Sequence, residues 1–152
     1  MSVVMSGLYV TDTDSKISFF NDIFEVPQRL SSRARGVISQ ALLKSPSEIK
    51  LSIPSVVFIE IFEKWIISEE FARKLHYEVY NIIIESPNIE IKPIEKEVLE
   101  NLLEVRDNLS RHEINDKIIV ASAMMLHCPI ITTDPQIIKY VRKTPAIPFI
   151  LN

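Results

Sequence analysis

The chain has 152 residues, a formal net charge of −3, 47% hydrophobic residues and 24% charged residues. This length fits one domain, residues 1–152, and the balance of apolar and charged residues argues against disorder. The only glycines are Gly7 and Gly36, so neither a GxGxxG nor a GxxxxGK phosphate-binding loop can be written. The composition therefore disfavours nucleotide-cofactor enzymes of the Rossmann and P-loop kinds.

The cysteine content and the lengths of the apolar runs indicate the cellular compartment. A single cysteine, Cys128, cannot form an internal disulfide and is expected to be a buried thiol in a reducing environment. No basic region followed by a long apolar stretch begins the chain, and charges interrupt every apolar run before it could cross a bilayer. We expect a soluble, cytoplasmic protein. The net charge neither supports nor excludes a nucleic-acid partner, and the local basic clusters are typical of solvated helix faces.

The first half of the chain alternates short apolar runs with helical patterns. Leu8–Val10 is a short unbroken run, typical of a buried parallel strand, and Ser55 is expected to cap a long apolar helix over 56–67. The other elements expected here are helices over Ser15–Phe24, Ser31–Leu43 and Glu69–Ile84 and a strand over Ile49–Ile53.

The second half repeats this alternation. Small residues at 121–123 would let an apolar helix over Asp116–Leu126 pack closely on a sheet. The remaining elements are a strand over Ile89–Pro93, a helix over Glu95–Val105, a strand over Pro129–Thr132, a helix beginning at Asp134–Pro135 and an edge strand near Ala146–Ile150. Regular alternation of strands and helices predicts an α/β fold, a three-layer α/β/α sandwich with a largely parallel central sheet.

Four acidic residues fall at unusual places in this layout. Asp12 and Asp134 each follow an expected strand, where ligands bind in parallel sheets. Glu60 lies inside the apolar run VVFIEIF, and Asp116 precedes the apolar run IIVASAMML. A carboxylate placed against core-forming segments is unfavourable unless something neutralises it, and a metal ion is a common neutraliser of oxygen ligands.

Each of these acids also has a purely structural interpretation. Asp134 is a natural helix cap before Pro135, and Asp116 is another possible cap. Asp12 is compatible with a strand-to-helix turn, and Glu60 with an ion pair to Lys64 one turn later. His112 is expected to end a loop and His127 to flank a helix end, so neither is expected to bind metal.

The four acids lie in segments that resemble the PIN-domain nucleases, most closely the VapC-like toxin ribonucleases of toxin–antitoxin pairs. YVTDTDSKISFF is similar to the first motif of that family, with Asp12 as its acid, and SIPSVVFIEIFEKW to the second, with Ser55 and Glu60. HEINDKIIVASAMML is similar to the third motif, with Asp116, and IITTDPQI to the fourth, with Thr132 and Asp134. The resemblance spans about residues 8–140.

The resemblance implies a divalent-metal-dependent endoribonuclease, the toxin of a toxin–antitoxin pair. It implies that Mg²⁺ or Mn²⁺ is held by Asp12, Glu60, Asp116 and Asp134, some of them through water. Further substrate contacts are expected at Ser55, Asp14, Asn115 and Thr132. The implied partners are an RNA substrate, an antitoxin protein and a second copy of the chain.

Four residues depart from the family's pattern near the expected site, among them Lys117, where an Arg is frequent. Asp14 stands where the family often has Asn, His or Ser, Lys16 where an apolar residue is usual, and Asn115 where a His often precedes the third acid. Lys16 would place a cation near the acids. This leaves open an alternative in which the chain is a PIN-like scaffold that binds RNA or a protein partner without cutting.

The helices across 56–84 are rich in aromatic residues, among them Trp65, Phe71, Tyr77 and Tyr80. Packing into the core is the simplest interpretation. The alternative is a dimer face or a groove for a partner helix.

Overall fold

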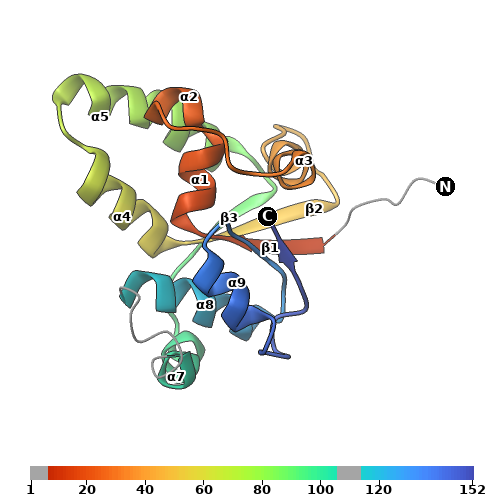
Figure 1. Ribbon diagram of the computed structural model, residues 1–152. Coiled ribbons are helices and arrows are strands. Elements are labelled where there is room, and N and C mark those ends of the chain that lie inside the picture. Colours follow the sequence, from red (N-terminus) through yellow and green to blue (C-terminus); the bar gives the residue numbers. More distant parts are fainter. Residues whose placement is uncertain (1–6, 106–113) are drawn as a thin grey trace.

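The computed structural model describes residues 7–105 and 114–152. The central sheet has five strands in the order β3-β2-β1-β4-β5, and every neighbouring pair is parallel (Figure 1). The strands are β1 (Gly7–Thr11), β2 (Ile49–Pro54), β3 (Ile89–Lys92), β4 (Ile130–Ile131) and β5 (Ile150–Leu151). The α/β fold with a parallel sheet is confirmed.

The helices fill the connections between the strands. Between β1 and β2 lie α1 (Thr13–Phe19), α2 (Asn21–Phe24) and α3 (Ser32–Ala41). Between β2 and β3 lie α4 (Ser55–Trp65), α5 (Glu69–Leu75), a π-helical segment η1 (His76–Tyr80) and α6 (Asn81–Glu85). The rest are α7 (Lys96–Val105), α8 (Ile114–Leu126) and α9 (Pro135–Val141).

Three of the expected helices differ from those observed. The helix expected over Ser15–Phe24 is two short helices that meet at Phe20. The one over Glu69–Ile84 is interrupted by the π-helical segment. Ser55 is not the cap of α4, because the cap position is Pro54 and no side-chain hydrogen bond closes it. Proline fixes its own φ but carries no polar side chain, so Ser55 becomes the first helical residue.

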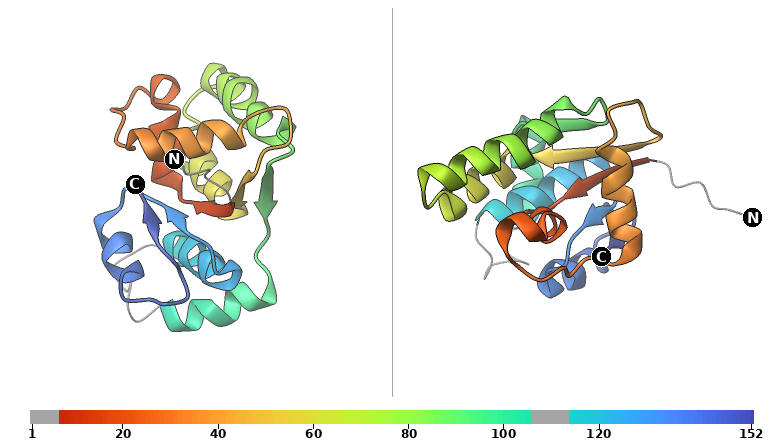
Figure 2. Two further views of the ribbon diagram at one scale, coloured as in Figure 1. Left: turned by 90° about the vertical axis from the view of Figure 1, so that its right-hand side faces the viewer. Right: turned by 90° about the horizontal axis from the view of Figure 1, so that it is seen from above.

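The helices cover both faces of the sheet, as Figure 2 shows from two sides. One face carries α7, α8 and α9, and the other carries α1 to α3 with α5 and α6, while α4 packs against both α1 and α8. A smaller apolar cluster lies between α3 and the sheet, with Ala34, Ile38 and Leu51 fully buried. The three-layer arrangement is the one expected from the alternation of strands and helices.

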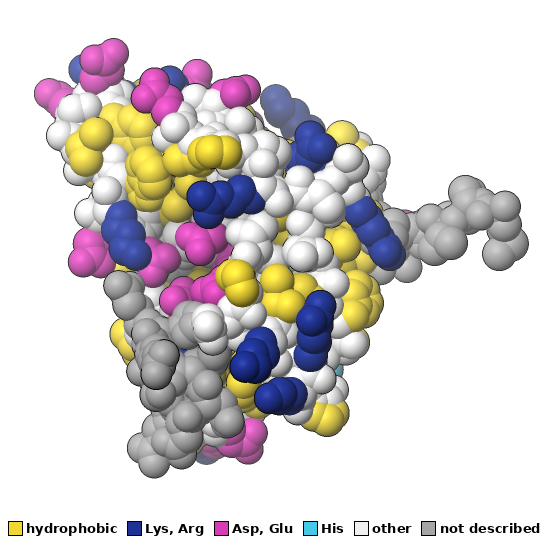
Figure 3. All heavy atoms as spheres, viewed as in Figure 1, with side chains coloured by type: hydrophobic (Ala, Val, Ile, Leu, Met, Phe, Trp, Pro, Cys, Tyr) yellow, Lys and Arg dark blue, Asp and Glu magenta, His cyan; other side chains and the backbone are white. Residues whose placement is uncertain are grey.

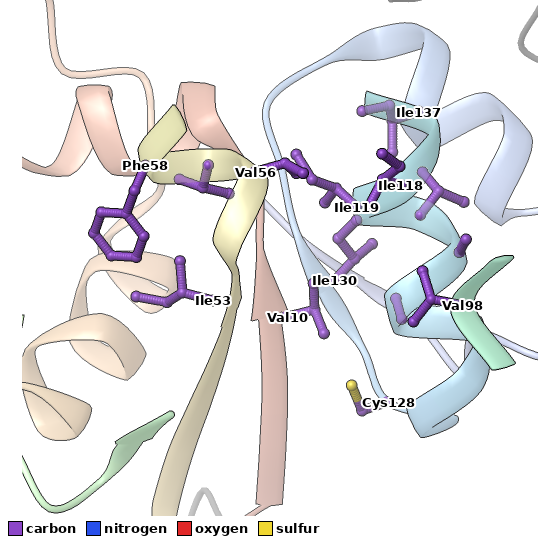
Figure 4. Packing of buried hydrophobic residues seen from close by; sticks show 14 of the residues in the cluster. Val10, Ile53, Val56, Phe58, Val98, Ile118, Ile119, Cys128, Ile130 and Ile137 are labelled. Carbon is purple, nitrogen blue, oxygen red and sulfur yellow. The ribbon is translucent and has the colours of Figure 1, made fainter. Parts of the chain in front are cut away.

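Helix α8 forms the centre of the larger core. Seven consecutive residues, 118 to 124, are buried, including Ala121, Ser122 and Ala123. A helix that is apolar on every side must be enclosed, and here the sheet, α4 and α7 enclose it. Figure 4 shows Ile118 beside Ile137, with Val56 pointing toward them. The first turns of α4, α8 and α9 therefore lie close together.

The strand order places a ligand-binding position at one edge of the sheet. The chain moves from β1 to β2 and β3, and then returns to the other side of β1 to form β4. This reversal lies between β1 and β4, and in open parallel sheets ligands bind beyond the carboxyl ends of the strands at such a switch. Asp12 follows β1 and Thr132 follows β4 at this position. No helix in the two described ranges is both long and apolar enough for a membrane span.

Candidate active site

Asp12 and Asp134 are joined through the hydroxyl of Thr132. The Thr132 Oγ1 donates a hydrogen bond to Asp12 Oδ2, and it accepts one from the backbone N–H of Asp134 at 3.1 Å. Thr132 itself is fully buried. Since β1 and β4 are paired neighbours, this one hydroxyl fixes the positions of the acids that follow both strands.

Asp12 is the cap of α1 as well as the residue that follows β1. Its Oδ1 accepts a hydrogen bond from the Ser15 backbone N–H at 2.8 Å, and only 2% of the residue is exposed. Burial raises the pKa of Asp12 to about 7, while the hydrogen bonds from Thr132 and Ser15 act in the opposite direction. The strand-to-helix turn proposed for Asp12 is thus present, with the carboxylate directed inward.

Replacing Thr132 by valine removes the donor to Asp12 while preserving the shape of the side chain. We expect the free energy of unfolding at pH 8 to fall by about 1–3 kcal/mol, because a buried carboxylate loses a partner. Urea denaturation measures this. Thr144→Val is the matched control, since the Thr144 hydroxyl bonds only the Tyr140 carbonyl in a half-buried position. Equal losses in the two variants would show that the Thr132–Asp12 bond is unimportant.

Lys16 is buried one helical turn after Asp12. It is 1% exposed, and its Nζ has no hydrogen-bond partner among the residues described. Burial lowers the pKa of Lys16 to about 7, and the nearby charge of Asp12 acts in the opposite direction. The expectation that this residue places a cation near the acids is confirmed in position, and the amine lies in the interior of the protein.

Near Asp12, the exposed residue Asp14 interacts with two other acids, the half-buried Asp134 and the buried Glu60. Asp14 reaches solvent, yet desolvation raises its pKa, and the charges of Asp134 and Glu60 raise it further. Figure 3 shows acidic side chains near the centre of one face, where Figure 1 places the first turns of α1, α4 and α9. Asp14 therefore joins the acidic group, in addition to occupying the position expected to contact substrate.

A cavity of about 310 Å³ opens beside these acids. Asp14 and Glu60 line it together with Arg29 and Lys64, and the positive charges of these two residues lower the pKa of Asp14. Trp65 contributes an apolar wall. A cavity that combines carboxylates with cations at its mouth suits a ligand that carries both a metal ion and phosphate groups.

Glu60 is 4% exposed although it lies on a helix. Its Oε2 is 3.8 Å from Lys64 Nζ, so the ion pair considered from the sequence is present but long. Lys64 is half exposed, which weakens the attraction through solvent screening. The Glu60 carboxylate therefore remains available to a second cation.

Asp116 and Asn115 occupy the first turn of α8. Both are half-buried, and neither is the cap because the helix begins at Ile114. Ile118, which follows this turn, belongs to the same buried cluster as Ile137 of α9 and lies near it in Figure 4. His127, in the left-handed conformation with φ 49°, follows the end of α8 as expected, while His112 lies outside the described residues.

The carboxylate oxygens of this site are suitable ligands for a hard divalent cation. Carboxylate oxygens are the ligands that Mg²⁺ and Mn²⁺ prefer, and the mutual repulsion at Asp14 is what a cation would relieve. Within the described ranges no three His, Cys, Asp or Glu side chains are arranged to ligate one ion directly. Mg²⁺ is usually held by one or two carboxylates and keeps several waters, so the arrangement is compatible with it.

Two features of the site are not predicted by the sequence. The sequence places Arg29 in a solvated basic cluster, yet it lines the cavity with Lys64. Thr13 also lines it, and its buried Oγ1 has no hydrogen-bond partner among the residues described. The position of Thr13 directly after Asp12 could have predicted its place at the site. A residue in the first turn of a helix that starts at a site lies close to that site.

Comparisons with known proteins agree with this geometry. A sequence model of the PIN domain matches residues 17–143, which is most of the chain. This chain therefore belongs to the PIN domain family. The match includes Glu60, Asp116 and Asp134 but begins after Asp12 and Lys16. None of the curated proteins compared with the chain is a match.

The fold is also found in other solved structures. The VapBC2 complex of Rickettsia felis, bound to a promoter DNA fragment, has a chain with a TM-score of 0.64 at 15% identity, covering 96% of this chain and 98% of that one. FitAcB from Neisseria gonorrhoeae gives 0.60 at 11% identity, with 95% and 96% covered. A toxin–antitoxin complex from Klebsiella pneumoniae gives 0.53 at 20% identity, with 91% and 94% covered.

Proposed function

We propose that this PIN-domain protein is a divalent-metal-dependent endoribonuclease and the toxin of a toxin–antitoxin pair. The observation that carries the proposal is the repulsion that Glu60 and Asp134 exert on Asp14 at the switch between β1 and β4. A carboxylate whose pKa is raised by neighbouring carboxylates is less stable in its charged form unless a cation is bound beside it. A bound Mg²⁺ or Mn²⁺ is the neutraliser that suits an all-oxygen donor set.

The acids take two kinds of role in this proposal. Glu60, Asp116 and Asp134 hold the cation, with Asp14 as an additional ligand directly or through water. Asp12 contributes negative charge from the buried side of the site. Its hydrogen bond with Thr132 also orients the Asp134 backbone, because the same hydroxyl accepts the Asp134 N–H. Asp12 was expected among the ligands, some of which bind through water, and the hydrogen bond accepted by each of its oxygens favours contact through water.

The catalytic roles follow from these positions. A divalent cation held here supplies Lewis acidity toward an attacking water and toward the phosphodiester. The cations of Arg29 and Lys64 at the cavity mouth attract the phosphates of the strand and position the scissile bond. In this proposal Asn115 and Ser55, which lie in the first turns of α8 and α4, donate hydrogen bonds to the sugar or phosphate. The expected products carry a 5′-phosphate and a 3′-hydroxyl.

An antitoxin partner is proposed from the apolar surface of α4 and α5. Trp65, Phe71 and Tyr80 pack against the core, so most of the aromatic residues are used there. Tyr77 and Ile67 are exposed by 66% and 81%, and Figure 3 shows hydrophobic side chains over the same part of the molecule. A cavity of about 330 Å³ between the two helices would receive apolar side chains of a partner helix. We also propose that the chain forms a homodimer.

Asp134→Asn tests the metal site without disturbing the fold. The Asp134 Oδ1 accepts the Gln136 N–H at 2.9 Å, and an asparagine oxygen caps a helix equally well. We expect the affinity for Mn²⁺, measured by titration calorimetry, to fall about tenfold or more because one ligand loses its charge. Asp22→Asn, on the exposed part of α2, is the control. Unchanged Mn²⁺ affinity in Asp134→Asn would contradict the proposed ligand set.

A non-cleaving PIN scaffold is the second candidate. The buried amine of Lys16 favours it, because an internal cation near Asp12 offsets part of the charge that a metal would otherwise neutralise. The same calorimetric titration separates the two candidates: an intact fold that binds no Mn²⁺ at millimolar concentration identifies the scaffold.

A further inference from the structure

A second concave surface lies at the far end of α9 from the acidic site. It is a cavity of about 540 Å³, lined by the turn that follows α9 and by β5. Arg142, Lys143 and Thr144 form one side, and Phe149 lies on the other side with 45% of its surface exposed. None of the described residues that line it is acidic. We call this surface the α9 pocket.

The basic residues of the α9 pocket make no ion pair with the part of the chain that the structure describes. Arg142 and Lys143 are both exposed, and neither has a carboxylate partner among the residues described. Cations that make no ion pair with the described residues and line a cavity without acidic side chains favour an anionic ligand. In the substrate of a ribonuclease, the anions that such cations bind are the phosphates of the RNA strand that is cleaved.

Phe149 adds a second kind of contact. Its ring meets Tyr9 edge to face, with centroids 6.2 Å apart, which holds the ring in place while one part remains open to solvent. A fixed aromatic ring beside a basic track is the combination that binds single-stranded nucleic acid, because bases stack on the ring while cations follow the backbone. A duplex would keep its bases stacked within the helix and could not use this ring.

Helix α9 connects the candidate active site to the α9 pocket. Asp134 caps the first turn of α9, and Arg142 caps its last turn. Seven helical residues span about 10 Å, a separation that a few nucleotides of an extended strand cover. Figure 3 shows Lys and Arg side chains below the acidic group on the same face, where Figure 1 places α9 and the turn after it.

We propose that the α9 pocket binds the single-stranded RNA that flanks the cleavage site. Arg142 and Lys143 bind its phosphates, and Phe149 stacks on one unpaired base. This inference rests on the proposed ribonuclease function, and it adds a contact region that the acids do not provide. It also assigns a substrate preference: RNA that is single-stranded for a few nucleotides on one side of the cleaved bond.

Binding of a fluorescently labelled, unstructured RNA oligonucleotide in EDTA tests the proposal, with anisotropy as the readout. We expect Arg142→Ala/Lys143→Ala to weaken binding about 10–30-fold near 0.1 M salt and to reduce the slope of log K against log salt by about 1.4, for two phosphate contacts. Phe149→Leu keeps an apolar contact with Tyr9, and we expect it to weaken binding about tenfold with little change in the slope.

Each control variant removes the same kind of side chain as the variant it is compared with, but away from the α9 pocket. Arg73→Ala/Lys74→Ala removes an adjacent exposed basic pair on α5, and Tyr77→Leu removes an exposed aromatic ring. Binding by these controls should match the unchanged protein within about twofold. Equal losses in the control pair and in the α9 pair, or an unchanged salt slope in the latter, would overturn the proposal.

Cleavage of the same RNA by the unchanged protein, in the presence of Mn²⁺, is measured separately. Cleavage together with unaffected binding in the α9 variants overturns the α9 pocket and leaves the ribonuclease function standing. Weakened binding in those variants without any cleavage by the unchanged protein supports the pocket and contradicts the ribonuclease function.

Discussion

Lys16→Met is expected to raise the free energy of unfolding at pH 7 by about 1–4 kcal/mol, because replacing a poorly compensated buried charge by an apolar side chain of similar length is commonly stabilising. Lys16 is 1% exposed, and its Nζ has no hydrogen-bond partner in the described part of the chain. The ammonium therefore loses its hydration on folding without regaining an equivalent contact.

The pH dependence gives this prediction a specific signature. The pKa of Lys16 falls from 10.5 to about 7 in the folded state, so between these values the unfolded chain binds more protons and stability rises with pH. The pKa of Asp12 rises from 3.8 to about 7, so between pH 4 and 7 the folded state binds more protons and stability falls as pH rises. Together the two groups produce a minimum in stability near pH 7 in the absence of metal.

Urea denaturation of the metal-free protein between pH 5 and 10 measures this profile. In Lys16→Met the rise above pH 7 should disappear, so the gain over the unchanged protein is largest at pH 7 and below and shrinks toward pH 10. Lys44→Met, at an exposed position, should change stability little at any pH. A Lys16→Met variant that is less stable than the unchanged protein at pH 7 would show that the ammonium is compensated by a contact outside the described residues.

Asp116→Ala is expected to reduce RNA cleavage by a factor of about 100 or more, since the loss of a carboxylate that holds the catalytic cation removes several kcal/mol of transition-state stabilisation. The residue lies in the first turn of α8. The fold should persist, because the removal of one acid from the start of a helix costs only about 0.3–1 kcal/mol.

Glu97→Ala provides the control for this second effect. Glu97 is an exposed acid in the first turn of α7, so its removal reproduces the loss of a favourable interaction with the helix dipole away from the site. We expect full cleavage activity in Glu97→Ala and matching thermal unfolding midpoints for the two variants. Full activity in Asp116→Ala would remove this residue from the catalytic group.

The sequence predicted the sheet better than the site. Strands such as Ile49–Ile53 and Ile89–Pro93 were found because a short run of alternating apolar residues that stops at a proline is typical of a strand. The break at Phe20 and the π-helical segment escaped prediction, since both depend on tertiary packing and leave the 3.6-residue periodicity nearly unchanged.

At the site, the sequence identified the residue types but not their surroundings. The positions of Asp12 and Asp134 after strands predicted that they would meet, and the bridging hydroxyl of Thr132 connects them. That Asp12 would be enclosed and Asp14 would face Glu60 and Asp134 could not be predicted, because burial at a strand end depends on how α1 and α4 pack over it. Arg29 was missed because its segment is remote in sequence and reaches the cavity only in the folded chain.

The most direct test of the central claim is cleavage of single-stranded RNA by the metal-free protein after addition of Mn²⁺. The account predicts no cleavage in EDTA, cleavage after Mn²⁺ is added in excess over the chelator, and products that carry a 5′-phosphate and a 3′-hydroxyl. Cleavage that persists in EDTA, or products that carry a 2′,3′-cyclic phosphate, would contradict a metal-dependent hydrolysis carried out by the acids around Thr132.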